Sequence, residues 1–271
     1  MAVISASILD ADFSRLREEV DRVAEADVDA FSLDVIDGHF APRISFGEYI
    51  VAVVRNWIVL PIEVHLMVER PERVVQRMCD AGADLILFHL EATDDPQGIV
   101  ERVRSEGRCV GVAVKEDTPI DAISDQLLGA IDVVNLLSVP IGFGGSKSAP
   151  DTLERVASLR GRAEALGIPL GIEVDGGVKP DNARGYAEAG ADMLTVGTGI
   201  YHADDAAEAV RTLASSTAGP ADVVARDRLH GFLDTPSRAP RDDAARRARL
   251  EGLRVAQDIP RRVWDPLRSP R

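Results

Sequence analysis

The chain has few cysteines, few aromatic residues and no long apolar run. Cys79 and Cys109 are its only cysteines, which argues against the disulfide framework of a small secreted domain. Aromatic residues make up 4% of the sequence, so a surface that stacks nucleic-acid bases on aromatic rings is not expected. No apolar run reaches the roughly 18 residues that span a bilayer, and no basic secretion signal is recognised. We expect a cytoplasmic protein that binds neither membranes nor nucleic acid.

Positive charge is scarce except near the C-terminus. The formal net charge is −14, but residues 226–271 carry 12 arginines and 7 acidic residues, against 19 basic and 38 acidic residues in 1–225. The main body should therefore repel polyanions. A small anion such as a sugar phosphate can still bind there, because backbone N–H groups act on it at short range.

Short β-branched runs alternate with helical patterns along most of the chain. Hydrophobic residues make up 45% of the sequence, as expected for parallel strands covered by helices. The expected strands are Val3–Leu9, Ala30–Val35, Ile62–Leu66, Leu85–Phe88, Cys109–Val114, Ile131–Leu137, Leu170–Val174 and Met193–Val196. Residues with helical spacing lie between them, as in Phe13–Ala26, Pro71–Ala81, Leu153–Leu166 and Asn182–Ala189. A βα unit that recurs this often favours an α/β fold of the (β/α)8 TIM-barrel type over an open sheet.

The repeating pattern stops near Ala214, so we expect a barrel over residues 1–214 and a C-terminal extension over 215–271. The extension is rich in proline and arginine, and residues 242–256 have the composition of one helix. A solvated or packed appendage is the simpler interpretation, and an arm that binds a partner or a second copy is the alternative. The sequence does not fix an oligomeric state, although a homo-oligomer is compatible with it.

Polar residues gather where the expected strands end, which is where TIM-barrel enzymes carry their active sites. Each has an ordinary structural explanation when taken alone: Asp–Gly pairs form turns, strand-end aspartates cap helices, and apolar strands can bury a histidine. Their convergence on one rim favours a functional site. The candidates are Ser7, Asp34, Asp37, His65, His89 and Asp175.

Glycine-rich segments follow the sixth, seventh and eighth expected strands. Such segments let backbone N–H groups approach a phosphate closely, and this position is where TIM barrels commonly bind one. The predicted phosphate-binding residues are Gly142, Phe143, Gly144, Gly145, Gly176, Gly177, Gly197 and Thr198.

The chain resembles the ribulose-phosphate 3-epimerase family over about residues 2–212. The matching motifs, in order, are A-S-I-L at 6–9, L-D-V-I-D-G-H-F at 33–40, V-H-L-M at 64–67, F-H-L-E at 88–91, G-F-G-G at 142–145, E-V-D-G-G at 173–177 and G-T at 197–198. The segment after about Ala214 has no counterpart in this resemblance.

The resemblance implies an epimerase that inverts C3 of a ketose phosphate, by default converting D-ribulose 5-phosphate to D-xylulose 5-phosphate. Asp34 and Asp175 would be the two acid/base groups, and Asp34, His65 and Asp175 would hold a divalent metal ion (Zn, Mn, Fe or Mg). Ser7, Asp37, Met67 and His89 would contact the substrate. A metal that polarises the carbonyl oxygen would stabilise the enediolate formed when one aspartate removes the proton.

Several residues depart from the family pattern. Ser32 stands where the family has a metal-binding histidine, and Ile36 and Leu137 replace methionines over the substrate. A hydroxyl is a weaker ligand than an imidazole for late transition metals, so the site should shift towards oxygen-preferring ions. Two alternatives stay open: the same chemistry on another sugar phosphate, and a catalytically silent phosphosugar-binding protein.

Overall fold

The structure is a computed structural model, and it describes residues 1–143, 145–218, 225 and 227–234. The strands form a closed parallel barrel in the order β1-β2-β3-β4-β5-β6-β7-β8. Their bounds are β1 Val3–Ser7, β2 Ala30–Ile36, β3 Ile62–Met67, β4 Leu85–His89, β5 Cys109–Val114, β6 Val133–Leu137, β7 Gly171–Asp175 and β8 Met193–Val196. The predicted TIM barrel is confirmed.

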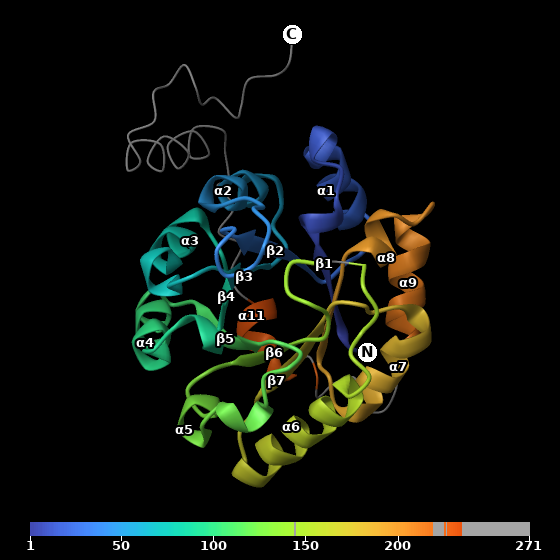
Figure 1. Ribbon diagram of the computed structural model, residues 1–271. Helices are drawn as coiled ribbons and strands as arrows, with labels where there is room; N and C mark the ends of the chain where they lie inside the picture. The colour runs from blue at the N-terminus through green and yellow to red at the C-terminus, as the bar shows by residue number, and fades with distance from the viewer. Residues whose placement is uncertain (144, 219–224, 226, 235–271) are drawn as a thin grey trace, which may run out of the picture.

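Helices surround this barrel (Figure 1). They are α1 Leu16–Ala24, α2 Glu48–Trp57, α3 Val75–Ala81, α4 Pro96–Ser105, α5 Asp125–Leu128, α6 Thr152–Leu166, α7 Pro180–Ala189, α8 Thr198–Tyr201, α9 Ala206–Ser216 and α11 His230–Leu233. The longer helices bury an apolar stripe against the strands, as α1 does with Leu16, Val20 and Val23. Three helices end at a glycine with positive φ, a conformation that glycine adopts without strain: Gly82 after α3, Gly167 after α6 and Gly190 after α7.

The first strand is shorter than predicted. The sequence indicates a strand to Leu9, but β1 ends at Ser7 and Ile8–Asp10 form the 3₁₀ turn η1. The Ser7 side chain accepts a hydrogen bond from the backbone N–H of Leu9 at 3.4 Å, which favours a turn over continued strand pairing. This early end brings Asp10 to the rim of the barrel.

The residues that immediately precede the even-numbered strands form a repeated device at the opposite end of the barrel. The carboxylates of Asp29, Asp84, Asp132 and Asp192 each accept a hydrogen bond from the backbone of the preceding odd-numbered strand, at 2.8 to 2.9 Å. Arg55 and Arg160 are buried beside Asp84 and Asp192. These contacts fix the N-terminal ends of neighbouring strands to one another.

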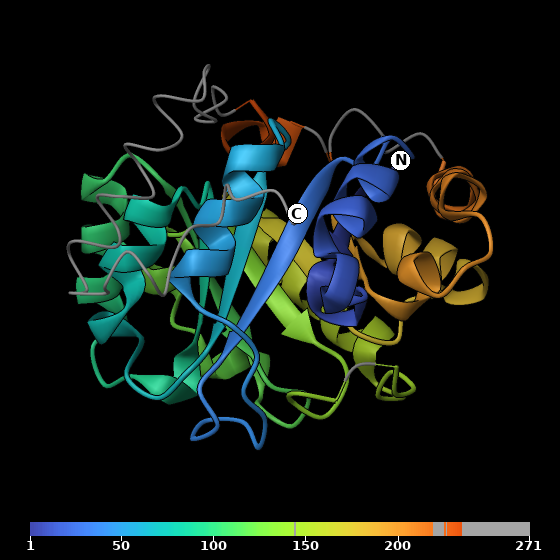
Figure 2. The ribbon, with the colours of Figure 1, turned by 90° about the horizontal axis from the view of Figure 1, so that it is seen from above.

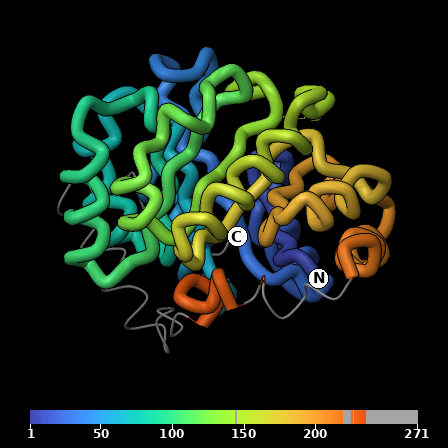
Figure 3. The backbone as a smooth tube through the Cα atoms, turned by 90° about the horizontal axis from the view of Figure 1, so that it is seen from below, coloured from blue at the N-terminus to red at the C-terminus, as the bar shows by residue number. Residues whose placement is uncertain are grey.

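The helix α11, beyond the eight βα units, closes that same end. Leu229 and Phe232 are buried in one cluster with inward residues of the strands, among them Val3, Leu85 and Met193. A Cβ at Gly171 would lie 2.7 Å from Leu229 Cδ2, so the missing side chain in β7 makes room for Leu229. Figure 2 places α11, in orange-red, at the end of the barrel away from the strand arrowheads, and Figure 3 shows it at the same end as the N-terminus. The predicted helix at 242–256 lies outside the described residues.

Candidate active site

Polar side chains line the inside of the barrel from its middle to the C-terminal ends of the strands. Register pairs Ser32 with Glu63 and Asp34 with His65, so side chains of β2 and β3 form two successive layers. On the other side, β6 and β7 pair Asn135 with Glu173 and Leu137 with Asp175. The layer that contains Glu63 and Glu173 is fully buried. The layer that contains Asp34 and Asp175 lies nearer the C-terminal ends of the strands and opens into a pocket.

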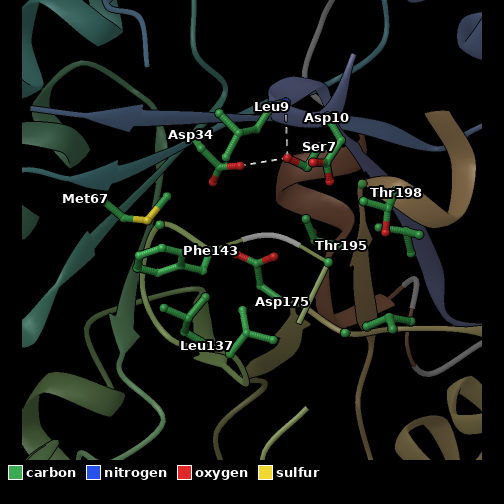
Figure 4. Close-up of a pocket in the computed structure, with 18 residues that line it drawn as sticks. Ser7, Leu9, Asp10, Asp34, Met67, Leu137, Phe143, Asp175, Thr195 and Thr198 are labelled. Carbon is green, nitrogen blue, oxygen red and sulfur yellow. Dashed lines mark hydrogen bonds between the residues drawn. The ribbon is translucent and has the colours of Figure 1, made fainter. Parts of the chain in front are cut away.

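Asp34, His65 and Asp175 come together at one point at the C-terminal ends of β2, β3 and β7. His65 Nδ1 lies 3.2 Å from Asp34 Oδ1 and 3.2 Å from Asp175 Oδ2. One ligand atom from each residue can be chosen so that all lie within 4.8 Å of one another. Figure 4 shows both carboxylates directed into the same space, with Ser7 donating a hydrogen bond to Asp34 Oδ2 at 2.7 Å. These three side chains therefore converge at the C-terminal rim of the barrel.

The donor set fits a divalent metal ion. Asp34 Oδ1 and His65 Nδ1 are buried and have no hydrogen-bond partner of acceptable geometry among the described residues. Buried polar atoms without partners are rare. Two carboxylate oxygens and one imidazole nitrogen form a common ligand set for Zn²⁺, Mn²⁺ or Fe²⁺.

Residues behind His65 fix the orientation of its ring. His65 Nε2 lies 3.0 Å from His89 Nε2, and His89 Nδ1 lies 3.1 Å from Glu91 Oε2. Burial lowers the pKa of His89 to about 4, so this ring is neutral near pH 7. Burial opposes ionisation of Glu91, but hydrogen bonds from His89 and Thr118 lower its pKa to about 2. A neutral His89 that donates from Nδ1 to Glu91 accepts a hydrogen bond from His65 Nε2, which leaves the Nδ1 lone pair of His65 directed between Asp34 and Asp175.

Without a metal, His65 is placed to hold a proton between the carboxylates. Burial alone would lower the pKa of His65, but Asp175 and Asp34 raise it well above the usual value. Burial raises the pKa of Asp175. A cation at this point is therefore favoured electrostatically, whether it is a proton or a metal ion.

The Ser32 hydroxyl is held by a neighbouring carboxyl group. Its hydroxyl donates a hydrogen bond of 2.8 Å to Glu63 Oε1, and both residues are fully buried. Burial and the neighbouring Glu173 raise the pKa of Glu63 well above its usual value. A buried carboxyl that no sequence motif indicates therefore lies beside Ser32.

The predicted substrate-binding residues divide into two groups. Ser7 and Met67 line the pocket together with the two aspartates. His89 is fully buried behind His65, and Asp37 lies outside the pocket lining. Asp37 instead accepts hydrogen bonds from three backbone N–H groups, those of His39, Phe40 and Glu69, at 2.8 to 2.9 Å.

The predicted phosphate-binding residues line the other end of this pocket. Those that the structure describes there are Gly142, Phe143, Gly145, Gly176, Gly177, Gly197 and Thr198. Gly144 lies outside the described residues. Asp10 also lines the pocket, and no sequence motif singled it out because its position depends on where β1 ends.

Fold and site together define a TIM barrel in which two buried carboxylates and a histidine meet at the C-terminal rim. A family model described as "Ribulose-phosphate 3 epimerase family" matches residues 3–201. The chain belongs to this family. It is an enzyme that acts on carbohydrates, of the epimerase class.

Curated relatives agree with this assignment. The chain is 37% identical over 211 residues to the ribulose-phosphate 3-epimerase of Mycobacterium tuberculosis (strain ATCC 25618 / H37Rv), covering 78% of this chain and 91% of the relative. It is 36% identical over 217 residues to the ribulose-phosphate 3-epimerase of Escherichia coli (strain K12), covering 80% of this chain and 96% of the relative.

Similar solved structures support the fold alone. An orotidine 5'-phosphate decarboxylase from Pyrococcus horikoshii OT3 matches with a TM-score of 0.58 at 18% identity, covering 80% of this chain and 99% of that chain. KGPDC from Streptococcus mutans matches with a TM-score of 0.58 at 16% identity, covering 80% and 97%. Within the described residues, no helix is both long and apolar enough to cross a membrane.

Proposed function

We propose that the protein inverts C3 of a ketose phosphate, with D-ribulose 5-phosphate and D-xylulose 5-phosphate as the default pair. The single observation that carries this proposal is the placement of Asp34 and Asp175 on either side of one point, each 3.2 Å from His65 Nδ1. Epimerisation needs one group to remove a proton and another to return one to the opposite face. Two carboxylates, one from β2 and one from β7, would meet that need.

The site residues divide the work between them. Asp34 and Asp175 are the proton-transfer groups, and Ser7 orients Asp34 through its hydrogen bond to Oδ2. His65, held by His89 and Glu91, presents Nδ1 to a divalent metal together with the two aspartates. The bound metal would polarise the substrate carbonyl and thereby stabilise negative charge on its oxygen. Met67 and Leu137 form apolar walls that keep water from the reacting carbon.

The decisive experiment is a conversion assay on purified protein supplied in turn with Mn²⁺, Zn²⁺, Fe²⁺ and Mg²⁺. Formation of D-xylulose 5-phosphate from D-ribulose 5-phosphate supports the default pair. Epimerisation of a hexulose 6-phosphate with higher kcat/KM would move the proposal to another sugar phosphate. No conversion with any metal would contradict the proposal and favour a phosphosugar-binding protein without catalysis.

A further inference from the structure

The carboxylate of Asp10 lies where the phosphate end of a substrate is expected. Asp10 ends the turn η1 after β1 and reaches across to the start of the segment that follows β8. A Cβ at Gly197 would collide with Asp10 Oδ2, so this oxygen packs directly on the Gly197 backbone. Figure 4 shows Asp10 beside Thr198, on the side of the pocket away from Met67.

Backbone contacts hold the carboxylate in this place. Burial raises the pKa of Asp10, and a hydrogen bond from the backbone of Thr198 opposes that rise. The N–H group of Thr198, which the sequence predicts to bind phosphate, therefore already has an anionic partner in the chain itself.

No lysine or arginine offsets this charge within the pocket. Its described lining contains the acids Asp10, Asp34 and Asp175 and neither Lys nor Arg. Arg43 and His202 act on Asp10 from outside that lining, and the Arg43 guanidinium stacks on the Phe143 ring at 4.8 Å. A dianionic phosphate that enters here meets a like charge at short range and competes with it for the same N–H donor.

We propose that Asp10 is a specificity-determining residue that weakens binding of the phosphate end of the substrate. A terminal hydroxyl can donate a hydrogen bond to the Asp10 carboxylate, whereas a phosphate dianion cannot. Asp10 therefore reduces the ratio of kcat/KM for a ketose phosphate to that for the corresponding unphosphorylated ketose. The statement about the sugar rests on the proposed function, but the statement about phosphate does not.

Titration with inorganic phosphate tests the phosphate statement without any catalysis. Isothermal titration calorimetry would compare wild type, Asp10→Asn and the control Asp12→Asn, whose acid lies two residues away outside this pocket. Removing the like charge should tighten phosphate binding about tenfold or more. The control should bind as wild type does. Equal dissociation constants for phosphate in wild type and Asp10→Asn, or no detectable phosphate binding by Asp10→Asn, would overturn the proposal.

Steady-state kinetics test the effect of Asp10 on the choice between phosphorylated and unphosphorylated sugar. The ratio of kcat/KM for D-ribulose 5-phosphate to that for D-ribulose should rise about tenfold in Asp10→Asn, mainly through a lower KM for the phosphate. An unchanged ratio in an active variant would overturn it. Asp10→Ser provides a second variant, and unchanged melting temperatures establish that both variants fold. If wild type converts neither sugar, the proposed function fails, while the phosphate titration still decides the role of Asp10.

Discussion

Carboxylates at the two ends of the barrel have opposite surroundings. At the N-terminal end, Asp84 and Asp192 are buried against Arg55 and Arg160 and accept backbone hydrogen bonds. Inside the barrel, Glu63 and Glu173 meet the hydroxyls of Ser32 and Thr195, and at the C-terminal rim Asp175 faces His65. These side-chain contacts of the second group, all within the part of the chain that the structure describes, involve neither arginine nor lysine.

The difference separates acids whose charge is paired within the fold from acids whose charge is not, and the proposed function assigns chemistry only to the second kind. Paired carboxylates with satisfied oxygens hold strands together. Carboxylates gathered without permanent cations are unfavourable for the fold, and such arrangements occur where a protein needs a poised proton or a metal site. The predictions below alter one end of the barrel at a time.

The largest effect is expected at His65. The substitution His65→Asn removes the imidazole between Asp34 and Asp175, the proposed proton-transfer groups, so metal content should fall towards zero and kcat should drop on the order of 10³-fold. Elemental analysis and steady-state kinetics measure both quantities. The exposed His39 provides the control His39→Asn. Full metal content in His65→Asn would contradict the ligand assignment.

At the opposite end, Asp84→Asn should destabilise the protein without changing the site. The substitution leaves the buried Arg55 guanidinium without its 2.5 Å carboxylate partner, and breaking a buried pair costs about 3–5 kcal/mol. The free energy of unfolding in urea measures this loss. The control Asp132→Asn breaks a pair whose Arg104 side chain is 42% exposed, and it should cost less than about 1 kcal/mol. A fall in kcat of folded Asp84→Asn would show that the two ends are not independent.

Glu173 should make stability depend on pH. Burial and Asp175 raise its pKa from 4.5 to about 7. Because the folded state then binds a proton that the unfolded state releases above pH 4.5, this group destabilises the fold progressively as pH rises between those values. The substitution Glu173→Gln should therefore stabilise the protein at pH 8 by about 1–3 kcal/mol relative to its effect at pH 4.

Urea unfolding at both pH values measures that difference. The exposed face of α7 supplies the control Asp181→Asn, which should leave the pH dependence of wild type intact. A Glu173→Gln variant with the same pH dependence as wild type would mean that Glu173 is ionised in the folded protein.

The smallest effect is expected at Ser32. The substitution Ser32→His adds an imidazole beside the site and should raise affinity for Zn²⁺ or Mn²⁺ about tenfold. Competition with a chelator measures the metal affinity, and elemental analysis measures the metal content. The control Ser32→Ala removes only the hydroxyl. An already full metal complement in wild type, unchanged in Ser32→His, would mean that position 32 does not limit metal binding.

The fold was predictable because each strand carries its own signal. Cys109–Val114 and Met193–Val196 have the predicted bounds, and the others differ by one or two residues at one end or, for Leu170–Val174, by one residue at each end. Asp34 and Asp175 were predictable because parallel strands bring their C-terminal ends to one rim. The positions of Asp10 and Glu63 were not, because they depend on where β1 ends and on which layer of the barrel a side chain enters. The packing of α11 likewise depends on a cavity that no local pattern reveals.

The measurement that tests the two-aspartate account most directly is deuterium incorporation from D₂O at C3 of ribulose 5-phosphate, followed by NMR. Wild type with bound metal should form D-xylulose 5-phosphate that carries deuterium at C3, whereas folded Asp34→Asn and Asp175→Asn should not form this epimer, because each lacks one of the two groups that inversion needs. The exposed control Asp181→Asn should behave as wild type does. Formation of the deuterated epimer at the wild-type rate by either aspartate variant would contradict the account.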